Sequence, residues 1–307
     1  MPAKRRCLIV GLDGFDVDVL INLYTFYKAS GMSVRVSRRP ANTDILVLCR
    51  PNMREIFSNV KASECHVYDY VGTNPIDLNA VFPRVENFIL IRPKLSSEDC
   101  EVSNIRCTEA MPPVMTDVWL SGPQPSRAID VGHIGHFKKG SENDKYGLRL
   151  INAISEGRVE VWGSGWDGVI DSEKAIIHPS TSVYESQHLY RNTNLSVGLM
   201  YDFQRSQTLS GRMWQAPLNG CLLESEPVDL AVQVPGVVCG DDYLLGTGIP
   251  KQVSESDIKD EAREYWNRVT ANLASFLGVR LMHVKLASFY GRRLLFAHHL
   301  KRGWSPF

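Results

Sequence analysis

The chain of 307 residues carries 34 Lys and Arg residues against 34 Asp and Glu residues, so its formal net charge is zero. This balance argues against bulk electrostatic binding to nucleic acid and leaves only a local basic patch open. With 44% hydrophobic residues, the chain can bury a core in each of two ordinary domains.

The first part of the chain alternates short apolar runs with amphipathic patterns. This rhythm predicts a mainly parallel sheet covered by helices. The predicted strands are 7–11, 32–38, 44–50, 65–71 and 87–93, and the predicted helices are 18–31, 53–62 and 75–85.

A second set of α/β units follows a stretch in which Pro and Gly cluster, residues 109–127, which we take as the domain boundary. Its predicted strands are 128–135, 158–163, 195–201 and 221–223. Its predicted helices are 144–157, 182–193, one that begins near 210–211, and 254–278. Two such units suggest two doubly wound domains that face a cleft, with ligands outside the carboxyl ends of the strands.

The seven cysteines are odd in number, scattered, and several lie inside apolar runs. No cysteine or histidine pair has metal-ligand spacing, and we expect no metal site. The apolar run before Gly11 is too short for a signal peptide, and no apolar stretch could span a bilayer. We therefore expect a reduced, soluble, cytoplasmic protein.

Two carboxylates of the first domain follow predicted strands. Asp13 lies between Gly11 and Gly14, and Asp69 ends a later strand. Either could take a proton from a hydroxyl acceptor as a general base. The alternatives are a helix N-cap for Asp13 and a strand-end turn for Asp69.

The second domain offers two glycine-containing turns. His133 and Gly135 end its first strand, where glycine lets a ligand approach the backbone and histidine can meet phosphate; a solvated turn is the alternative. The run 159–168 ends in a Gly163-x-Gly165 turn flanked by Trp162 and Trp166. The tryptophans could stack on a nucleobase or simply pack in the core.

A third feature is the segment SQTLSGRMWQAPLNGCLLESE, residues 206–226. It predicts a helix that begins near Ser210 and Gly211 and carries Arg212 in its first turn. Because the helix amino end is already positive, a cation there is favourable only with an anion bound. Arg212 would then hold a diphosphate; the alternative is a surface ion pair.

These motifs, in this order over residues 128–227, resemble the carboxyl-terminal half of GT-B glycosyltransferases, most of all the CgeB-like group. The resemblance implies two Rossmann-like domains facing a central cleft, a nucleotide-sugar donor in the second domain and an acceptor in the first. It implies neither cofactor nor metal. The acceptor could be a glycan, a lipid or another hydroxyl compound.

The resemblance also transfers roles to positions of this chain. Arg212 would meet the donor phosphates, and Gln215 and Gln207 stand where the related retaining enzymes have glutamates. An amide binds hydroxyls but cannot stabilise a cation by charge, so an inactive nucleotide-binding protein is the alternative function, with an epimerase third. The family also shows a helix with Tyr before an Asn-bearing strand, which the run VYESQHLYRNTNLSVGLM resembles through Tyr184. The donor-binding residues that the motifs and the resemblance indicate are His133, Gly135, Gly163, Gly165, Trp166, Tyr184, Gln207, Ser210, Gly211, Arg212 and Gln215.

The expected domains are 1–123 for the acceptor, 124–255 for the donor, and 256–307 as helices that pack back toward the first domain. The tail 289–307 interleaves basic and apolar residues. It could instead touch an anionic membrane from the cytoplasmic side.

Overall fold

The computed structural model describes residues 4–11, 17–49, 57–69, 78–95, 105–119, 127–137, 139–140, 145–170, 172–198, 210–225, 233–239 and 254–302. These residues form two six-stranded sheets, and every pair of neighbouring strands within them is parallel. The chain divides into two compact units. Among the described residues, the first unit takes those up to Val118 and Trp266–Leu295, and the second takes those from Trp119 to Tyr265 and from Phe296 onward.

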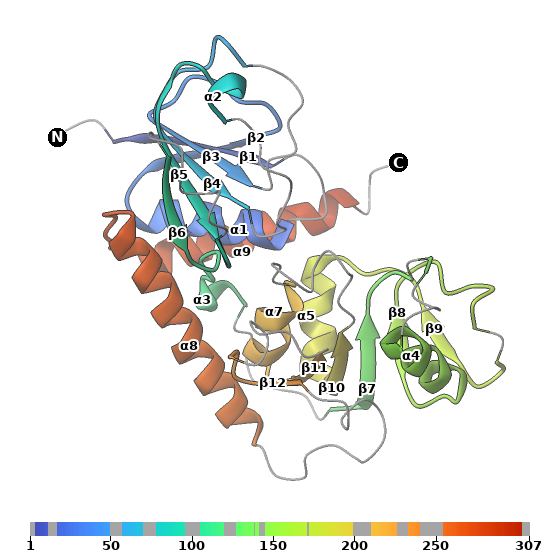
Figure 1. Cartoon of the computed structure of the whole chain (residues 1–307). Coiled ribbons are helices and arrows are strands. Elements are labelled where there is room, and N and C mark those ends of the chain that lie inside the picture. The colour runs from blue at the N-terminus through green and yellow to red at the C-terminus, as the bar shows by residue number, and fades with distance from the viewer. Residues whose placement is uncertain are drawn as a thin grey trace. The chain divides into compact units, whose positions relative to one another are not determined.

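The first sheet has the order β2-β1-β3-β4-β5-β6 (Figure 1). Its central strands are buried along nearly their whole length, since all five residues of β3 are buried, which is typical of a parallel sheet covered on both faces. The strands are β1 Arg6–Gly11, β2 Ser33–Ser37, β3 Ile45–Cys49, β4 Ala62–Tyr68, β5 Val85–Arg92 and β6 Ile105–Glu109.

Helix α1, Val17–Ala29, covers this sheet and is buried almost all round. It ends where Gly31 takes a φ of 86°, a left-handed conformation that glycine adopts without strain. The amide of Gly31 donates to the carbonyl of Lys28, and the amide of Met32 donates to that of Tyr27, which satisfies the last turn. Two short helices, α2 Leu78–Val81 and α3 Thr116–Trp119, complete the amino-terminal part.

The second sheet has the order β12-β11-β10-β7-β8-β9. Helix α4 packs on one face through Leu150, Ala153 and Ile154, whereas α5 and α7 lie side by side (Figure 1). The strands are β7 Ile129–Ile134, β8 Glu160–Trp162, β9 Ile176–His178, β10 Thr193–Gly198, β11 Leu222–Ser225 and β12 Val237–Cys239. The helices are α4 Lys145–Ser155, α5 Val183–Asn192 and α7 Arg212–Leu218.

Two long helices end the chain, α8 Glu255–Phe276 and α9 Val284–Arg302. In the first unit they are tied to the amino-terminal part by hydrogen bonds. Thr270 accepts from the amide of Val114 and donates to its carbonyl, both at 3.0 Å, and the amide of Met282 donates to Ala29 at 3.0 Å. Among the described helices, none is long and apolar enough to cross a membrane.

Most predicted elements match the structure, with the following exceptions. Helix α3 was not predicted, and in the described part of the helix predicted over 75–85 only Leu78–Val81 is helical. The helix predicted over 53–62 is wrong in its described part: Phe57 bonds through its amide to Val81 and stacks on Phe82, and Ala62 already begins β4. Strands β6, β9 and β12 were not predicted. All three lie at sheet edges, where partial exposure weakens the apolar pattern.

Candidate functional site

The second sheet reverses its direction of growth between β7 and β10. The chain runs from β7 outward to β8 and β9, then returns to place β10 on the other side of β7. This is the strand order of the Rossmann fold, in which ligands bind outside the carboxyl ends of the strands at the reversal. Residues that end or follow β7 and β10 are therefore the first candidates for a site.

Four residues converge at this reversal, and we call them the switch-point cluster: His133, Gly135, Gly198 and Arg212. A Cβ on Gly135 would lie 2.5 Å from Nη2 of Arg212 and 2.8 Å from Nε2 of His133. A Cβ on Gly198 would lie 3.6 Å from Cδ of Arg212. The Arg212 side chain thus runs from the end of β10 to the end of β7, and a side chain at Gly135 would require the Arg212 guanidinium or the His133 ring to shift.

His133 is uncharged in this cluster. It is buried, and its Nδ1 lies 2.8 Å from the carbonyl oxygen of Val197, to which it donates. Burial and then the Arg212 guanidinium lower the pKa of His133 to about 3. With the proton on Nδ1, Nε2 carries a lone pair on the side of Gly135 and Arg212.

Helix α7 is anchored by its apolar residues, which fixes the position of Arg212. Met213, Trp214, Ala216 and Leu218 are fully buried. Pro217 is in the last turn, and the side chain of Asn219 donates to the carbonyl of Gln215 at 2.7 Å. The helix begins where the sequence predicts, directly after Ser210 and Gly211, and the Gln215 side chain is buried.

The turn after β8 supports the cluster from the other side. Gly163 lies so close to the carbonyl of Gly135 that a Cβ would overlap it. Trp166 donates from Nε1 to the same carbonyl at 3.0 Å, and Gly165 makes the turn with a φ of 82°. This turn therefore holds the backbone that faces Arg212.

Both tryptophans of this turn pack in the protein rather than exposing a ring. Trp166 is 1% exposed and contacts His133 and Phe137, and Trp162 stacks on His178 at 4.6 Å. In this structure Trp162 and Trp166 therefore pack in the core, which is the alternative to stacking on a nucleobase.

Tyr184 has a different environment. It lies on α5, whose first turn is closed by reciprocal bonds between Ser182 and Glu185. Its ring contacts His188 of the same helix and Phe296 and His299 of α9. Two of the three ring contacts that the structure gives for Tyr184 therefore lie with α9.

Glu224 is a residue that sequence reasoning missed. It lies on β11 in register with Val197 of β10, and β10 in turn pairs with β7, which carries His133. The side chains of Glu224, Val197 and His133 therefore leave the same face of the sheet. It is 1% exposed, and neither carboxylate oxygen has a hydrogen-bond partner among the described residues. Burial raises its pKa to about 7, against the opposing charge of Arg149.

The first sheet has its own reversal between β1 and β3. Asp13, which follows β1, lies outside the described residues, as does Gln207. Asp69 is described: it is buried and accepts from Nε and Nη2 of Arg92 at 2.9 and 2.6 Å. Both hydrogen bonds engage the same carboxylate oxygen in a buried ion pair, so the geometry of Asp69 favours a structural role.

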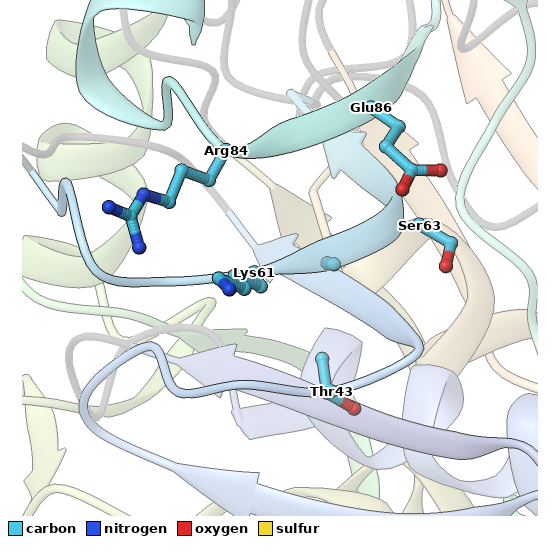
Figure 2. Close-up of a pocket in the computed structure, with 6 residues that line it drawn as sticks. Thr43, Lys61, Ser63, Arg84 and Glu86 are labelled. Carbon is cyan, nitrogen blue, oxygen red and sulfur yellow. The ribbon is translucent and has the colours of Figure 1, made fainter.

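A surface depression of about 480 Å³ lies at the opposite edge of the first sheet (Figure 2). It is lined where β4 and β5 begin by Thr43, Lys61, Ala62, Ser63, Arg84 and Glu86. Parallel sheets bind ligands at carboxyl ends, and this depression lies at amino ends. In Figure 2 the Arg84 and Glu86 side chains point away from each other rather than toward one centre.

Within the described part of the chain, no three His, Cys, Asp or Glu residues group as metal ligands.

No family model matches the chain, and no curated protein matches its sequence. Among solved structures, Anabaena Alr3699/HepE in complex with UDP and glucose is similar with a TM-score of 0.55 and 10% identity, over 89% of this chain and 99% of that one. AviGT4, a glycosyltransferase involved in avilamycin A biosynthesis, has a TM-score of 0.48 and 10% identity over 95% and 98% of the two chains. T4 phage BGT, solved with UDP and Mn²⁺, has a TM-score of 0.47 and 9% identity over 96% and 98%.

The likeness to HepE concerns the fold, which is the GT-B fold of two Rossmann-like α/β units. The predicted fold class is therefore confirmed.

Proposed function

We propose that this protein is a glycosyltransferase that moves a sugar from a nucleotide-diphosphate donor to a hydroxyl acceptor. The observation that carries the proposal is the switch-point cluster, in which a guanidinium and a neutral histidine meet at the ligand edge of a Rossmann-type sheet. Arg212 offers a planar pair of donors that suits a diphosphate, and Gly135 lets the phosphate oxygens reach the backbone.

The reaction separates charge, and each proposed residue acts at one atom. The acceptor oxygen attacks the anomeric carbon while the bond from that carbon to the β-phosphate oxygen breaks. The acceptor proton goes to a base, for which Asp13 is the choice. The electron pair leaves with the nucleoside diphosphate, whose growing negative charge Arg212 stabilises.

His133 suits this step because it stays neutral. A pKa of about 3 keeps the ring unprotonated at neutral pH, so its Nε2 can accept a hydrogen bond from a sugar or ribose hydroxyl. The amides of Gln215 and Gln207 would bind hydroxyls in the same manner, without charge.

Several finer features belong to the proposal as well. The first unit would hold the acceptor, which would be a glycan, a lipid or another hydroxyl compound. By its motifs over residues 128–227, the chain would fall in the CgeB-like group. Transfer would need no metal, since Arg212 supplies positive charge at the leaving group. Six described cysteines are free thiols, which suits a cytoplasmic location.

The deciding experiment is a panel of nucleotide sugars and free nucleotides tested for thermal stabilisation, followed by donor hydrolysis with EDTA or with Mn²⁺. We expect stabilisation by one nucleotide class and release of its diphosphate in EDTA. Lack of stabilisation by every nucleotide at millimolar concentration would contradict the proposal. Binding without release or transfer would mark the inactive alternative, and activity only with Mn²⁺ would remove the metal-independent part.

A further inference from the structure

Helix α9 packs on α1 through one face only. Ala287, Ser288, Gly291 and Leu295 are buried, and Gly291 fits against Thr25 and Val118 so closely that a Cβ would clash with Thr25. The two helices lie side by side (Figure 1). The first unit thus covers one face of α9 up to Leu295, and farther along the helix Phe296 and His299 contact Tyr184 of α5.

The opposite side carries a regular series of large exposed residues at alternating steps of four and three. From Leu286 onward this spacing forms one stripe along α9, and Met282 extends the series just before the helix begins. The exposed fractions are 57% for Met282 and Leu286, 55% for Phe289, 46% for Phe296 and 53% for Leu300. Arg293 fills the remaining position of the series, with its guanidinium 5.8 Å from the Phe289 ring centre. We call Met282, Leu286, Phe289, Arg293, Phe296 and Leu300 the basic apolar stripe.

The charged residues in and around this stripe are all positive. Residues 265–307 contain seven Lys and Arg residues and no Asp or Glu, although the whole chain is neutral. Lys285 and Arg292 flank the stripe and are exposed. A second copy of α9 on this stripe would bring Arg292 and Arg293 against their own counterparts, which like-charge repulsion disfavours.

We propose that the basic apolar stripe lies on an anionic membrane surface. Exposed Leu, Phe and Met side chains next to Lys and Arg are the combination that inserts an amphipathic helix at the level of the headgroups while its cations meet the lipid phosphates. The membrane-facing surface would be the stripe along α9 itself, whose residues up to Arg293 belong to the first unit and whose Phe296 and Leu300 belong to the second. This inference does not depend on the proposed sugar transfer.

The test is co-sedimentation of the full chain with vesicles of phosphatidylcholine alone or with about a third of phosphatidylglycerol. We expect binding only to the anionic vesicles and release in 0.5 M NaCl, because salt screens the surface potential. Arg292→Gln with Arg293→Gln should weaken binding about tenfold or more, since each cation near such a surface is worth about 1 kcal/mol. Leu286→Ser with Phe289→Ser should weaken it at least about tenfold.

Matched controls separate the stripe from general charge and hydrophobicity. Arg38 and Arg39 are an adjacent exposed pair in the same unit, and Leu148 and Ile176 are exposed by 45% and 44% elsewhere. The corresponding Gln and Ser double variants should bind like the native chain, and thermal unfolding should show every variant folded. Equal binding to neutral vesicles, or equal loss in the controls, would overturn the proposal. A dimer that Leu286→Ser with Phe289→Ser dissociates, without vesicle binding, would assign the stripe to self-association instead.

Discussion

The two sheets are built alike, yet the side chains at their carboxyl edges differ in how they are used. At the edge of the first sheet, Asp69 and Arg92 neutralise each other in a buried pair. At the edge of the second, Arg212 lies over two glycines beside a histidine that is kept neutral by burial and by that same cation. The Asp69–Arg92 pair joins β5 to the residue that follows β4, whereas the Arg212 guanidinium lies beside Gly135, where an anion could approach it.

In both sheets, strand order and parallel pairing provide only the location of a site. The first sheet reverses between β1 and β3 and the second between β7 and β10. The chemistry at each reversal depends on the few residues that end or follow the strands. In the sequence, Asp13 follows β1 of the first unit, and His133 and Gly135 end and follow β7 of the second. The following predictions test this division between structural and functional charges.

The largest effect should come from Asp13. Asp13→Asn keeps a group that can cap a helix but removes the base, so transfer should fall by about 10²–10⁴-fold while donor binding is unchanged. Transfer rates and nucleotide affinity measured on the same preparation check this. If transfer keeps its original rate, Asp13 is only a cap.

Asp69→Asn should act on stability instead. The substitution removes the carboxylate charge that accepts from Nε and Nη2 of Arg92, and breaking a buried pair in this way typically costs about 3–5 kcal/mol. Urea unfolding should show this loss, and transfer per folded molecule should be nearly unchanged. The opposite result, full stability with lost transfer, would make Asp69 the base and reverse the comparison at the first sheet.

Glu224 provides a pH-dependent test in the second sheet. Its folded pKa of about 7 exceeds its ordinary value of 4.5, so the unfolded chain ionises first as pH rises. The stability it contributes is complete below about pH 4.5 and is lost as pH rises to about 7, by at most about 3 kcal/mol.

Glu224→Gln removes the titration without removing the hydrogen-bonding shape. The variant should therefore be more stable than the native protein at pH 8 and similar to it at pH 5. Urea unfolding at the two pH values measures the difference. A variant that is equally stable at pH 8 would mean that the carboxylate is solvated or paired in solution.

The smallest effect expected is that of Arg212→Ala on binding. Charge-assisted bonds to phosphate are each worth about 1.5–3 kcal/mol, so nucleoside diphosphate affinity should fall at least about tenfold while nucleoside affinity is retained. Arg158, an exposed arginine paired with Glu156, is the control for a lost charge, and Arg158→Ala should bind normally. An equal loss for nucleoside and diphosphate would show that Arg212 holds the fold.

Much of the fold could be predicted because burial leaves a pattern in the sequence. Strand β3 is a continuous apolar run, β1 and β5 each contain one, and the helix predicted to begin near Ser210 and Gly211 begins at Arg212. Edge strands β6, β9 and β12 carry weaker patterns because one side of each lacks a neighbour. The region around Phe57 was mistaken for a helix because its contacts with Val81 and Phe82 come from a segment more than 20 residues away.

By itself, the sequence determined two parallel α/β units and the residue types at their turns, since apolar periodicity and glycine placement are local properties. The tertiary structure decided which of those residues meet. It buried Trp166 beneath the Gly135 carbonyl, paired Asp69 with Arg92, and brought Glu224 into register with His133 across an intervening strand. These outcomes depend on strand order and on pairing between distant segments, and pairing is set by the packing of the whole sheet rather than by any short stretch of chain.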